Sequence, residues 1–200
     1  MSVSMRTRTP SPIWLLRLWR HVAALHRNNS GLAAVEFAMI IPLMAALLVG
    51  TNEFAAGVAV DRKVTLMART LSDLTSQNTK VTDDQLTNFF NASKAIMTPY
   101  TATPVQGTIS ELYINPTTLK ARVQWSQGVE THADGDIIDI PDALKVGDTY
   151  LIYSEVKYKY VPSVAWFINK TDGITLRDVS YTRPRQGLCV MYKTDTCTVK

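Results

Sequence analysis

The chain has 200 residues and a formal net charge of +4 at pH 7, from 21 Lys and Arg against 17 Asp and Glu. Residues 1–30 contain no acid and five basic residues, which leaves 16 basic and 17 acidic residues in the rest of the chain. The positive excess therefore belongs to the N-terminal leader. The charge therefore does not indicate a nucleic-acid partner, and the sequence has no Gly-rich phosphate loop or RNA-reading motif that would. We expect no nucleic-acid partner.

The basic leader, residues 1–31, precedes a long apolar run. By the positive-inside rule, an Arg-rich segment before a membrane span stays in the cytoplasm and sends the C-terminal side across the membrane. Residues 13–20 intersperse Arg among apolar side chains, a pattern equally typical of a short interfacial helix and of a disordered basic region. Asn28-Asn29-Ser30-Gly31 has the composition of a turn, so we expect the bond after Gly31 to be open to a protease.

The apolar run extends from Leu32 to Val60 and contains only four polar residues. A membrane-spanning helix needs about 20 residues, and the stretch from Leu32 to Thr51 supplies them. Pro42 is tolerated in such a helix because neighbouring groups satisfy the carbonyl that it frees. Small residues, which let a second helix approach closely, occur at Ala46, Gly50 and Gly57. We therefore predict a transmembrane helix with an extramembrane continuation over residues 32–80.

The same run also fits a secretory signal. Such signals have apolar cores of about 7–15 residues, and Phe37–Val49 is within that range. Ala55-Ala56-Gly57 would then be the cleavage site. Under this alternative the chain is a Sec-exported soluble binding domain in the periplasm.

Two acids interrupt the run, Glu36 and Glu53. A carboxylate at the centre of a membrane helix costs roughly 2.5–3.5 kcal/mol, and less near an end. We expect Glu36 to lie in the first helical turn, where the helix macrodipole favours an anion. It still needs a partner that the nearby sequence does not supply. Glu53 follows Thr51 and Asn52, and we expect it to be solvated at the outer interface.

Beyond the apolar run, apolar residues recur at spacings of four, three, four and three: Val60, Val64, Met67, Leu71 and Leu74. This heptad pattern predicts that the helix continues to about Gln77, roughly 45 residues and about 70 Å at 1.5 Å per residue. Charged residues occupy the other faces. The seam should pack either against the chain's own globular domain or against neighbouring subunits, and we expect the former.

Residues 81–200 are expected to form one exported α+β domain. Thr82-Asp83-Asp84-Gln85 is a good helix start, and the helix should end before Pro99. Four stretches rich in β-branched and aromatic residues then predict strands: 108–114, 119–126, 149–160 and 174–182. The segment 115–118 fits a hairpin connection, and Val164–Ile168 is a short apolar element before the Asp172-Gly173 turn. We predict an antiparallel sheet covered by helix.

Cys189 and Cys197 are the only cysteines, and their even number predicts one disulfide that closes a small loop in an oxidising compartment. His132 is the only histidine after the leader, and no nucleophile elbow is present, so we predict that the protein is not an enzyme. The acidic loop His132–Asp139 lacks the ligand spacing of a Ca²⁺ loop. We therefore expect neither a metal nor a cofactor.

Gly31 followed by four residues, then Glu36-Phe37 and an apolar helix, resembles the type IV prepilin processing site. The longer run Gly-Leu-Ala-Ala-Val-Glu-Phe-Ala from Gly31, with Pro42 and a second Glu53-Phe54, resembles the TadE-like pseudopilins of tight-adherence (Flp) pilus systems. The likeness covers residues 31–77. Ile174-Thr175-Leu176 and Arg183-Pro184-Arg185 also resemble the end of TadE-like domains, whereas the middle of the chain carries no matching motif.

The resemblance implies that a prepilin peptidase cuts after Gly31 and makes Leu32 the new N-terminus, with or without N-methylation. Glu36 would then be the fifth-position glutamate of the family. The new α-amino group, with a pKa near 7.7–8.0, would be mostly positive at neutral pH. Paired across subunits, this ammonium and the Glu36 carboxylate would remove each other's desolvation cost and set the stagger between helices. Glu36 and Phe37 are the assembly residues that the resemblance implies.

The resemblance also implies a pilin-like fold and a single-pass protein of the bacterial inner membrane, with a cytoplasmic N-terminus and a periplasmic domain. Its partners would be the prepilin peptidase, other pilin or pseudopilin subunits, the inner-membrane assembly machinery and membrane lipid. Besides the Sec-exported domain, two alternatives stay open. One is a bitopic, membrane-anchored envelope protein of unknown role, and the other is a membrane-tethered enzyme that depends on His132.

Overall fold

The computed structural model describes residues 31–163, 173–193 and 197. The chain divides into two compact units, residues 1–51 and residues 52–200, and the boundary falls inside one long helix. The described part of the first unit is helical, and the second unit contains the strands and the other helices. This confirms the predicted α+β layout. The short apolar element expected at 164–168 lies outside the described residues.

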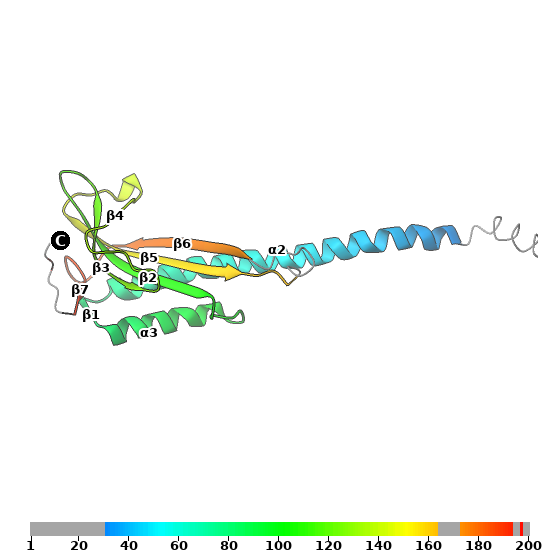
Figure 1. Ribbon diagram of the computed structural model, residues 1–200, viewed down its shortest axis with the longest axis horizontal. Coiled ribbons are helices and arrows are strands. Elements are labelled where there is room, and N and C mark those ends of the chain that lie inside the picture. Colours follow the sequence, from blue (N-terminus) through cyan, green and yellow to red (C-terminus); the bar gives the residue numbers. More distant parts are fainter. Residues whose placement is uncertain (1–30, 164–172, 194–196, 198–200) are drawn as a thin grey trace, which may run out of the picture. The chain divides into compact units, whose positions relative to one another are not determined.

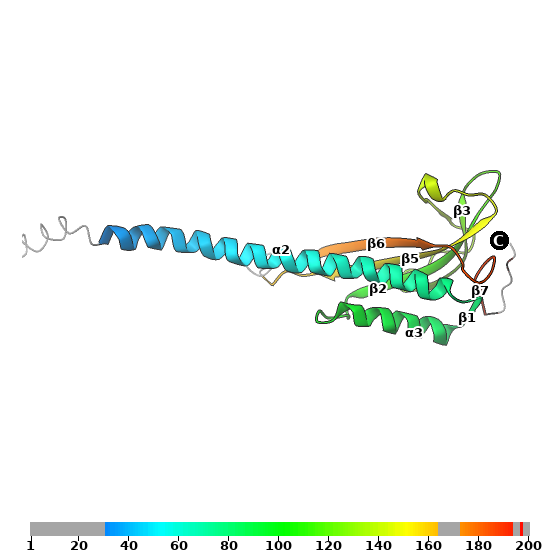
Figure 2. The same cartoon turned by 180° about the vertical axis from the view of Figure 1, so that it is seen from behind.

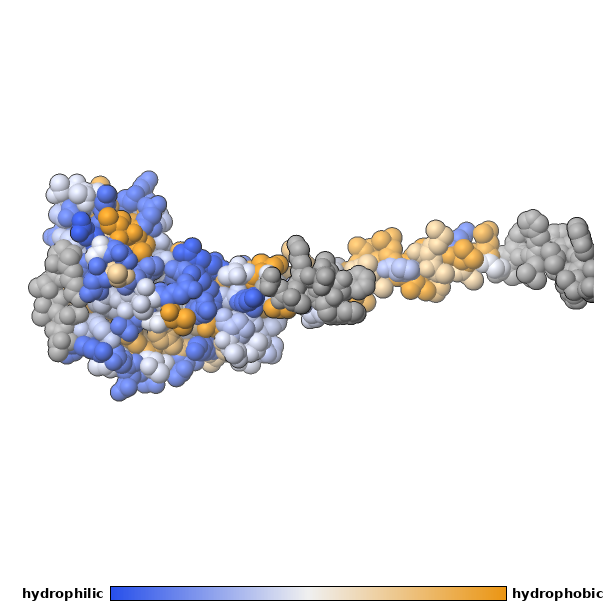
Figure 3. All heavy atoms as spheres, in the orientation of Figure 1, coloured by the Kyte–Doolittle hydropathy of each residue, from blue (hydrophilic) through white to orange (hydrophobic). Residues whose placement is uncertain are grey.

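The long helix α2 begins at Leu32 and ends at Ser76, with Pro42 inside it, close to the predicted end at about Gln77. The residues from 31 to 51 are all exposed, and Figure 3 shows apolar side chains on the surface of this segment. At the other end, the side-chain Nδ2 of Asn78 donates a hydrogen bond to the Leu74 carbonyl at 2.7 Å. This bond satisfies one of the carbonyls that a helix leaves unpaired in its last turn.

Five strands form one antiparallel sheet in the order β4-β3-β2-β5-β6 (Figure 1 and, from behind, Figure 2). Their bounds are β2 Val105–Ile114, β3 Ala121–Gly128, β4 Ile137–Ile138, β5 Thr149–Tyr160 and β6 Ile174–Thr182. The predicted strands at 149–160 and 174–182 have these bounds, and the first two predictions are shifted by a few residues. β4 was not predicted, because two isoleucines in an acidic loop are too short a run to indicate a strand.

The connection between β2 and β3 is the predicted hairpin. The Asn115 Oδ1 accepts hydrogen bonds from the backbone N–H groups of Thr117 and Thr118, at 2.9 and 3.0 Å. An asparagine side chain that holds the next two or three residues in this way mimics a backbone turn. The turn therefore sets the antiparallel pairing of the two strands.

The second helix, α3, runs from Asp83 to Lys94 and begins with a capping box, in which the Thr82 and Gln85 side chains each accept the other residue's backbone N–H. A short 3-10 helix, η2 (Ala95–Met97), follows it. Lys63 of α2 then donates two hydrogen bonds of 2.8 Å, to the carbonyls of Ile96 and Thr98. The end of the α3 segment is thereby tied to α2.

Both helices cover the same face of the sheet (Figure 1, Figure 2). The predicted heptad seam is the buried side of α2. Leu74 is half-buried, and the other four residues are fully buried: Val60, Val64, Met67 and Leu71. The seam packs against Val105 of β2 and against Val156 and Tyr158 of β5. Leu86 of α3 packs against the neighbouring part of the same face. The seam therefore packs against the chain's own domain, as predicted.

The opposite face of the sheet carries a second apolar cluster. It contains Leu112 of β2, Val123 of β3 and Leu151 of β5, and the chain between β3 and β5 covers it with Ile140 and Leu144. Because both faces are covered here, all residues of β5 from 150 to 156 are buried. This burial explains why the apolar alternation of β5 is only approximate in the sequence.

A two-stranded parallel sheet lies where α2 connects to α3. β1 (Lys80–Val81) pairs with β7 (Met191–Tyr192), and the Lys193 N–H donates to the Val81 carbonyl at 3.1 Å. The chain after β6, residues 183–193, therefore crosses to this connection, and we call it the C-terminal strap. Its Arg185 N–H donates to the Ser76 carbonyl at 2.9 Å, at the last residue of α2.

Candidate functional site

The predicted processing site coincides with the start of α2. Gly31 immediately precedes the helix, and Leu32 is its first residue. A Cβ atom added to Gly31 would meet no described atom within 4 Å. The fold of this chain therefore has room for a larger residue here. A requirement for glycine at this position would have to come from the protease.

Glu36 is the fifth residue of α2, and the first turn of the helix contains no acid. The expectation that Glu36 lies in the first turn is therefore wrong by one residue, and the macrodipole, which acts mainly within that turn, stabilises its charge less. Glu36 is exposed, and so is Phe37, at 65%. Among the described residues the Glu36 carboxylate has no hydrogen-bond or ion-pair partner.

By its length and composition, α2 could cross a membrane. Among the described residues it is one helix that meets both criteria. Its large side chains are mostly solvent-accessible, for example Met39 at 74% and Leu48 at 74%. Ala46 is exposed, and a Cβ added to Gly50 would meet no described atom within 4 Å. Another helix could therefore approach α2 at Gly50.

Gly57, the third small residue predicted to pack helices, has a neighbour in its own domain. A Cβ atom on Gly57 would lie 3.7 Å from the Tyr160 ring, an ordinary van der Waals distance. The same tyrosine contacts Glu53. The prediction that Glu53 is solvated is wrong, because its side chain is half-buried. The Glu53 Oε2 accepts hydrogen bonds from the Tyr160 hydroxyl at 3.2 Å and from the Ser163 N–H at 3.1 Å. Glu53 therefore fastens α2 to the end of β5.

The predicted disulfide is present between Cys189 and Cys197, whose Cα atoms are 5.8 Å apart. Cys189 is buried, and the next residue, Val190, is held on both sides of its backbone. The Val190 N–H donates to Glu111 Oε1 at 2.6 Å, and the Trp125 Nε1 donates to the Val190 carbonyl at 2.8 Å. The disulfide thus closes a loop next to Val190, where Glu111 of β2 and Trp125 of β3 bind the C-terminal strap.

Glu111 is a buried acid that the sequence reasoning missed. It is 2% exposed, and burial raises its pKa to about 8, although the hydrogen bond from the Val190 N–H opposes the shift. A strand places residues i and i+2 on the same face, so Glu111 shares the buried face with Ile109, which is fully buried. An acid at a core position of an alternating strand is the signal that could have identified it.

A second buried acid, Glu155, lies on the opposite face and is surrounded by donors. It accepts hydrogen bonds from Arg177 Nε at 2.7 Å, Tyr153 Oη at 2.9 Å and, within an ion pair, Lys157 Nζ at 3.2 Å. Burial disfavours its charged form, but these donors outweigh the burial and hold the pKa of Glu155 below its usual range. Lys157 also pairs with Glu130. The network fastens the chain after β3 to β5.

His132, the residue on which the enzyme alternative depends, lies beside this network. Its Nε2 is 3.9 Å from Glu155 Oε2 and forms no hydrogen bond with the described residues. A cavity of about 430 Å³ lies next to it and is lined by Tyr153 and Tyr181. Within the described residues no serine or cysteine side chain bonds to the imidazole. A nucleophile–base pair, which catalysis of acyl transfer requires, is therefore not formed here.

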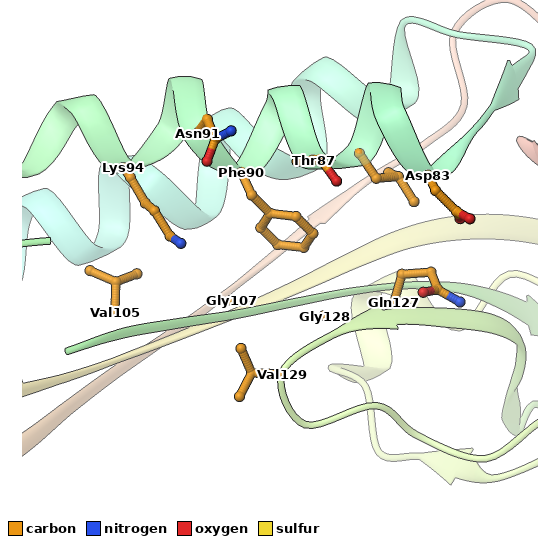
Figure 4. A pocket seen from close by; sticks show the side chains of 11 residues that line it. Asp83, Thr87, Phe90, Asn91, Lys94, Val105, Gly107, Gln127, Gly128 and Val129 are labelled. Atoms are coloured by element: carbon orange, nitrogen blue, oxygen red, sulfur yellow. The ribbon is translucent and has the colours of Figure 1, made fainter. Parts of the chain in front are cut away.

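A second cavity, of about 330 Å³, lies between α3 and the strands β2 and β3 (Figure 4). Phe90, Val105 and Val129 give it apolar walls. Asp83 stands at its rim, but its carboxylate pairs with Lys193 Nζ at 2.7 Å and also accepts the Tyr192 hydroxyl. The acid at this cavity therefore holds the C-terminal strap.

Comparison of the chain with protein-family models, with curated proteins and with solved structures gives no match. Its function must therefore be inferred from its own residues. The features that stand out are an exposed acid at the start of an exposed apolar helix and a domain whose buried acids bind neighbouring segments of the chain.

Proposed function

We propose that the protein is a TadE-like pseudopilin, a membrane-anchored and non-enzymatic component of tight-adherence (Flp) pilus assembly that prepilin peptidase matures after Gly31. One observation carries this proposal. The helix α2 begins at the residue after Gly31, and its fifth residue is an exposed carboxylate in an otherwise apolar segment. The residues around this junction are also those that resemble the family.

In this proposal, cleavage creates the group that Glu36 lacks. The new α-amino group at Leu32 carries a positive charge at neutral pH. An ammonium and a carboxylate are each costly in lipid when alone, and they offset each other's cost when they pair. Because Glu36 has no partner among the described residues, the amine of a neighbouring subunit is the partner that we propose. Pairing would then fix the axial position of one helix against the next.

The apolar segment also has the length of a membrane span. The twenty residues from 32 to 51 extend about 30 Å at 1.5 Å per residue, close to the thickness of the hydrocarbon core. We place the leader in the cytoplasm because of its arginines and the domain in the periplasm of the bacterial inner membrane. The Cys189–Cys197 disulfide is consistent with that oxidising compartment. The domain would be pilin-like.

One observation also favours the alternative of a Sec-exported soluble domain. Cleavage after Gly57 would remove Glu53 but would leave the whole buried seam of α2, from Val60 to Leu71, inside the domain. The core of the domain therefore does not require the apolar segment. Fractionation separates the two functions: the pseudopilin should leave membranes only in detergent, whereas the released domain should be found in the soluble fraction at high salt.

The assembly role is tested by replacing Glu36 with Gln, which keeps the shape of the side chain and removes its charge. We expect Glu36→Gln to be processed and to stay in the membrane, while crosslinked capture of partner subunits falls by about tenfold or more, which corresponds to about 1.4 kcal/mol. The matched control is Asp61→Asn, which removes an exposed acid of the same helix outside the apolar segment. Normal capture and assembly by Glu36→Gln would refute the pairing.

A further inference from the structure

The end of β5 and the start of β6 lie beside α2 (Figure 1). The hydrogen bonds from Tyr160 and Ser163 to Glu53 fix this position within the second unit. Glu53 is only two residues after Thr51, the last residue of the apolar stretch. Along the continuous helix α2, Glu53 is therefore within one helical turn of the place where a membrane span would end.

The corner exposes large apolar side chains. Phe54 is 74% exposed, Val161 49% and Ile174 58%. Val161 directly follows β5, and Ile174 pairs with Tyr160 in the ladder between β5 and β6. Gly173 keeps these strand ends close, because its φ is +66° and a Cβ there would lie 2.6 Å from the Tyr160 carbonyl oxygen. Val161 and Ile174 therefore lie on either side of this turn. Phe54 follows Glu53, which holds the same strand end through Tyr160 and Ser163.

The polar residues at this corner are of the kinds that occur at membrane–water interfaces. Tyr160 packs its ring toward Gly57 while its hydroxyl is hydrogen-bonded to Glu53. Tyrosine, with one apolar and one polar end, is enriched at the headgroup level of bilayers. Lys159 is exposed and points away from the face that α2 covers. A cation in this position favours anionic lipid headgroups.

We propose that Phe54, Val161 and Ile174 form a second membrane contact, which lies in the boundary between headgroups and acyl chains of the bilayer that α2 crosses. The inference rests on the proposed membrane anchor. Lipid is the occupant because Phe54 belongs to the same continuous helix as the apolar stretch and is three residues after Thr51, about 4.5 Å along the helix axis. This contact would limit the tilt of the domain on its anchor.

The test uses the full chain, with its native disulfide intact and a single environment-sensitive fluorophore on an added cysteine, in vesicles of phosphatidylcholine and phosphatidylglycerol. The probe replaces Val161, and the matched control replaces Val146. Val146 precedes the other end of β5 and is 43% exposed, close to the 49% of Val161. We expect the probe at Val161→Cys to emit at shorter wavelength than the control and to be quenched at least about twofold more by lipids spin-labelled near the headgroup.

Equal emission and equal quenching at the two positions, in vesicles that carry the protein, would overturn the second contact and leave the anchor intact. Failure of the labelled chains to float with the vesicles would overturn the anchor as well. Ile174→Cys provides an independent reading if Val161→Cys does not fold. A blue shift that needs an added pilin subunit, and that spin-labelled lipid does not quench, would assign the patch to protein contact and contradict the proposal.

Discussion

Replacing Glu111 by Gln is predicted to remove most of the pH dependence of stability between weakly acidic and weakly basic conditions. The Glu111 carboxyl is 2% exposed and accepts the Val190 N–H at 2.6 Å. Burial raises its pKa from 4.5 to about 8. Glutamine keeps an oxygen that can accept the same N–H and cannot ionise, so the variant isolates the charge from the contact.

The sign of the pH dependence is set by whether the folded or the unfolded chain binds the proton. Between its unfolded pKa of 4.5 and its folded pKa of about 8, Glu111 is protonated in the folded chain and ionised in the unfolded chain. The free energy of unfolding therefore falls as the pH rises, by at most about 1.4 kcal/mol per pH unit. The stabilisation is complete below the unfolded pKa and is lost as the pH rises through the folded pKa. Over the whole window the loss is on the order of 3–5 kcal/mol.

Other shifted groups act outside this window. Hydrogen bonds from Lys193 and Tyr192 hold the pKa of Asp83 below its usual range. Burial raises the pKa of Glu155, but hydrogen bonds from Arg177 and its neighbours outweigh the burial and lower it. Both acids therefore lose stabilisation only as the pH falls through their folded pKa values. The pKa of Lys193 is raised and lies on the basic side. Within the described residues, Glu111 alone is shifted into the range between.

The assay is urea unfolding of the full chain in detergent at about pH 5 and about pH 8, at constant ionic strength, followed by near-ultraviolet circular dichroism. We expect the wild type to lose several kcal/mol between the two conditions and Glu111→Gln to lose much less. Asp61→Asn is the control, since it removes an exposed carboxylate outside these networks. Parallel losses in the wild type and in Glu111→Gln would refute the reasoning.

Three further substitutions test the core, the strap and the processing site. Leu71→Ala should lower the free energy of unfolding by about 2–5 kcal/mol in urea titrations because Leu71 is fully buried, whereas Leu66→Ala, at a side chain 53% exposed, should change it little. Cys189→Ser should lower the free energy of unfolding by about 2–3 kcal/mol in the same titrations and speed amide exchange in the C-terminal strap. Equal exchange rates would show that the disulfide does not hold the strap. Gly31→Leu should block processing on a gel, while Gly50→Leu should be cut normally.

Much of the fold could be predicted because the deciding signals are local. The heptad of Val60 to Leu71 specifies one buried side of α2, and the Thr82–Gln85 capping box starts α3 where the sequence indicates. β5 and β6 have the predicted bounds because long runs of β-branched and aromatic residues end at polar or Gly-containing turns. The pairing of Cys189 with Cys197 followed from there being only two cysteines.

The contacts that organise the domain could not be predicted, because they join residues distant in sequence. Glu111 meets Val190, 79 residues away, and Glu53 meets Tyr160, 107 residues away. A pattern read along one segment carries no information about which other segment it will meet. The parallel pairing of Lys80–Val81 with Met191–Tyr192 involves only two residues on each side, too few to show a period.

The central claim is that the chain is cut after Gly31 so that a new amine can pair with Glu36 of another subunit. The most direct measurement is the intact mass and N-terminal sequence of the protein isolated from cells that contain prepilin peptidase. A chain that begins at Leu32, with or without one methyl group, is the predicted result. A chain that still begins at Met1, or that begins after Gly57, would contradict it.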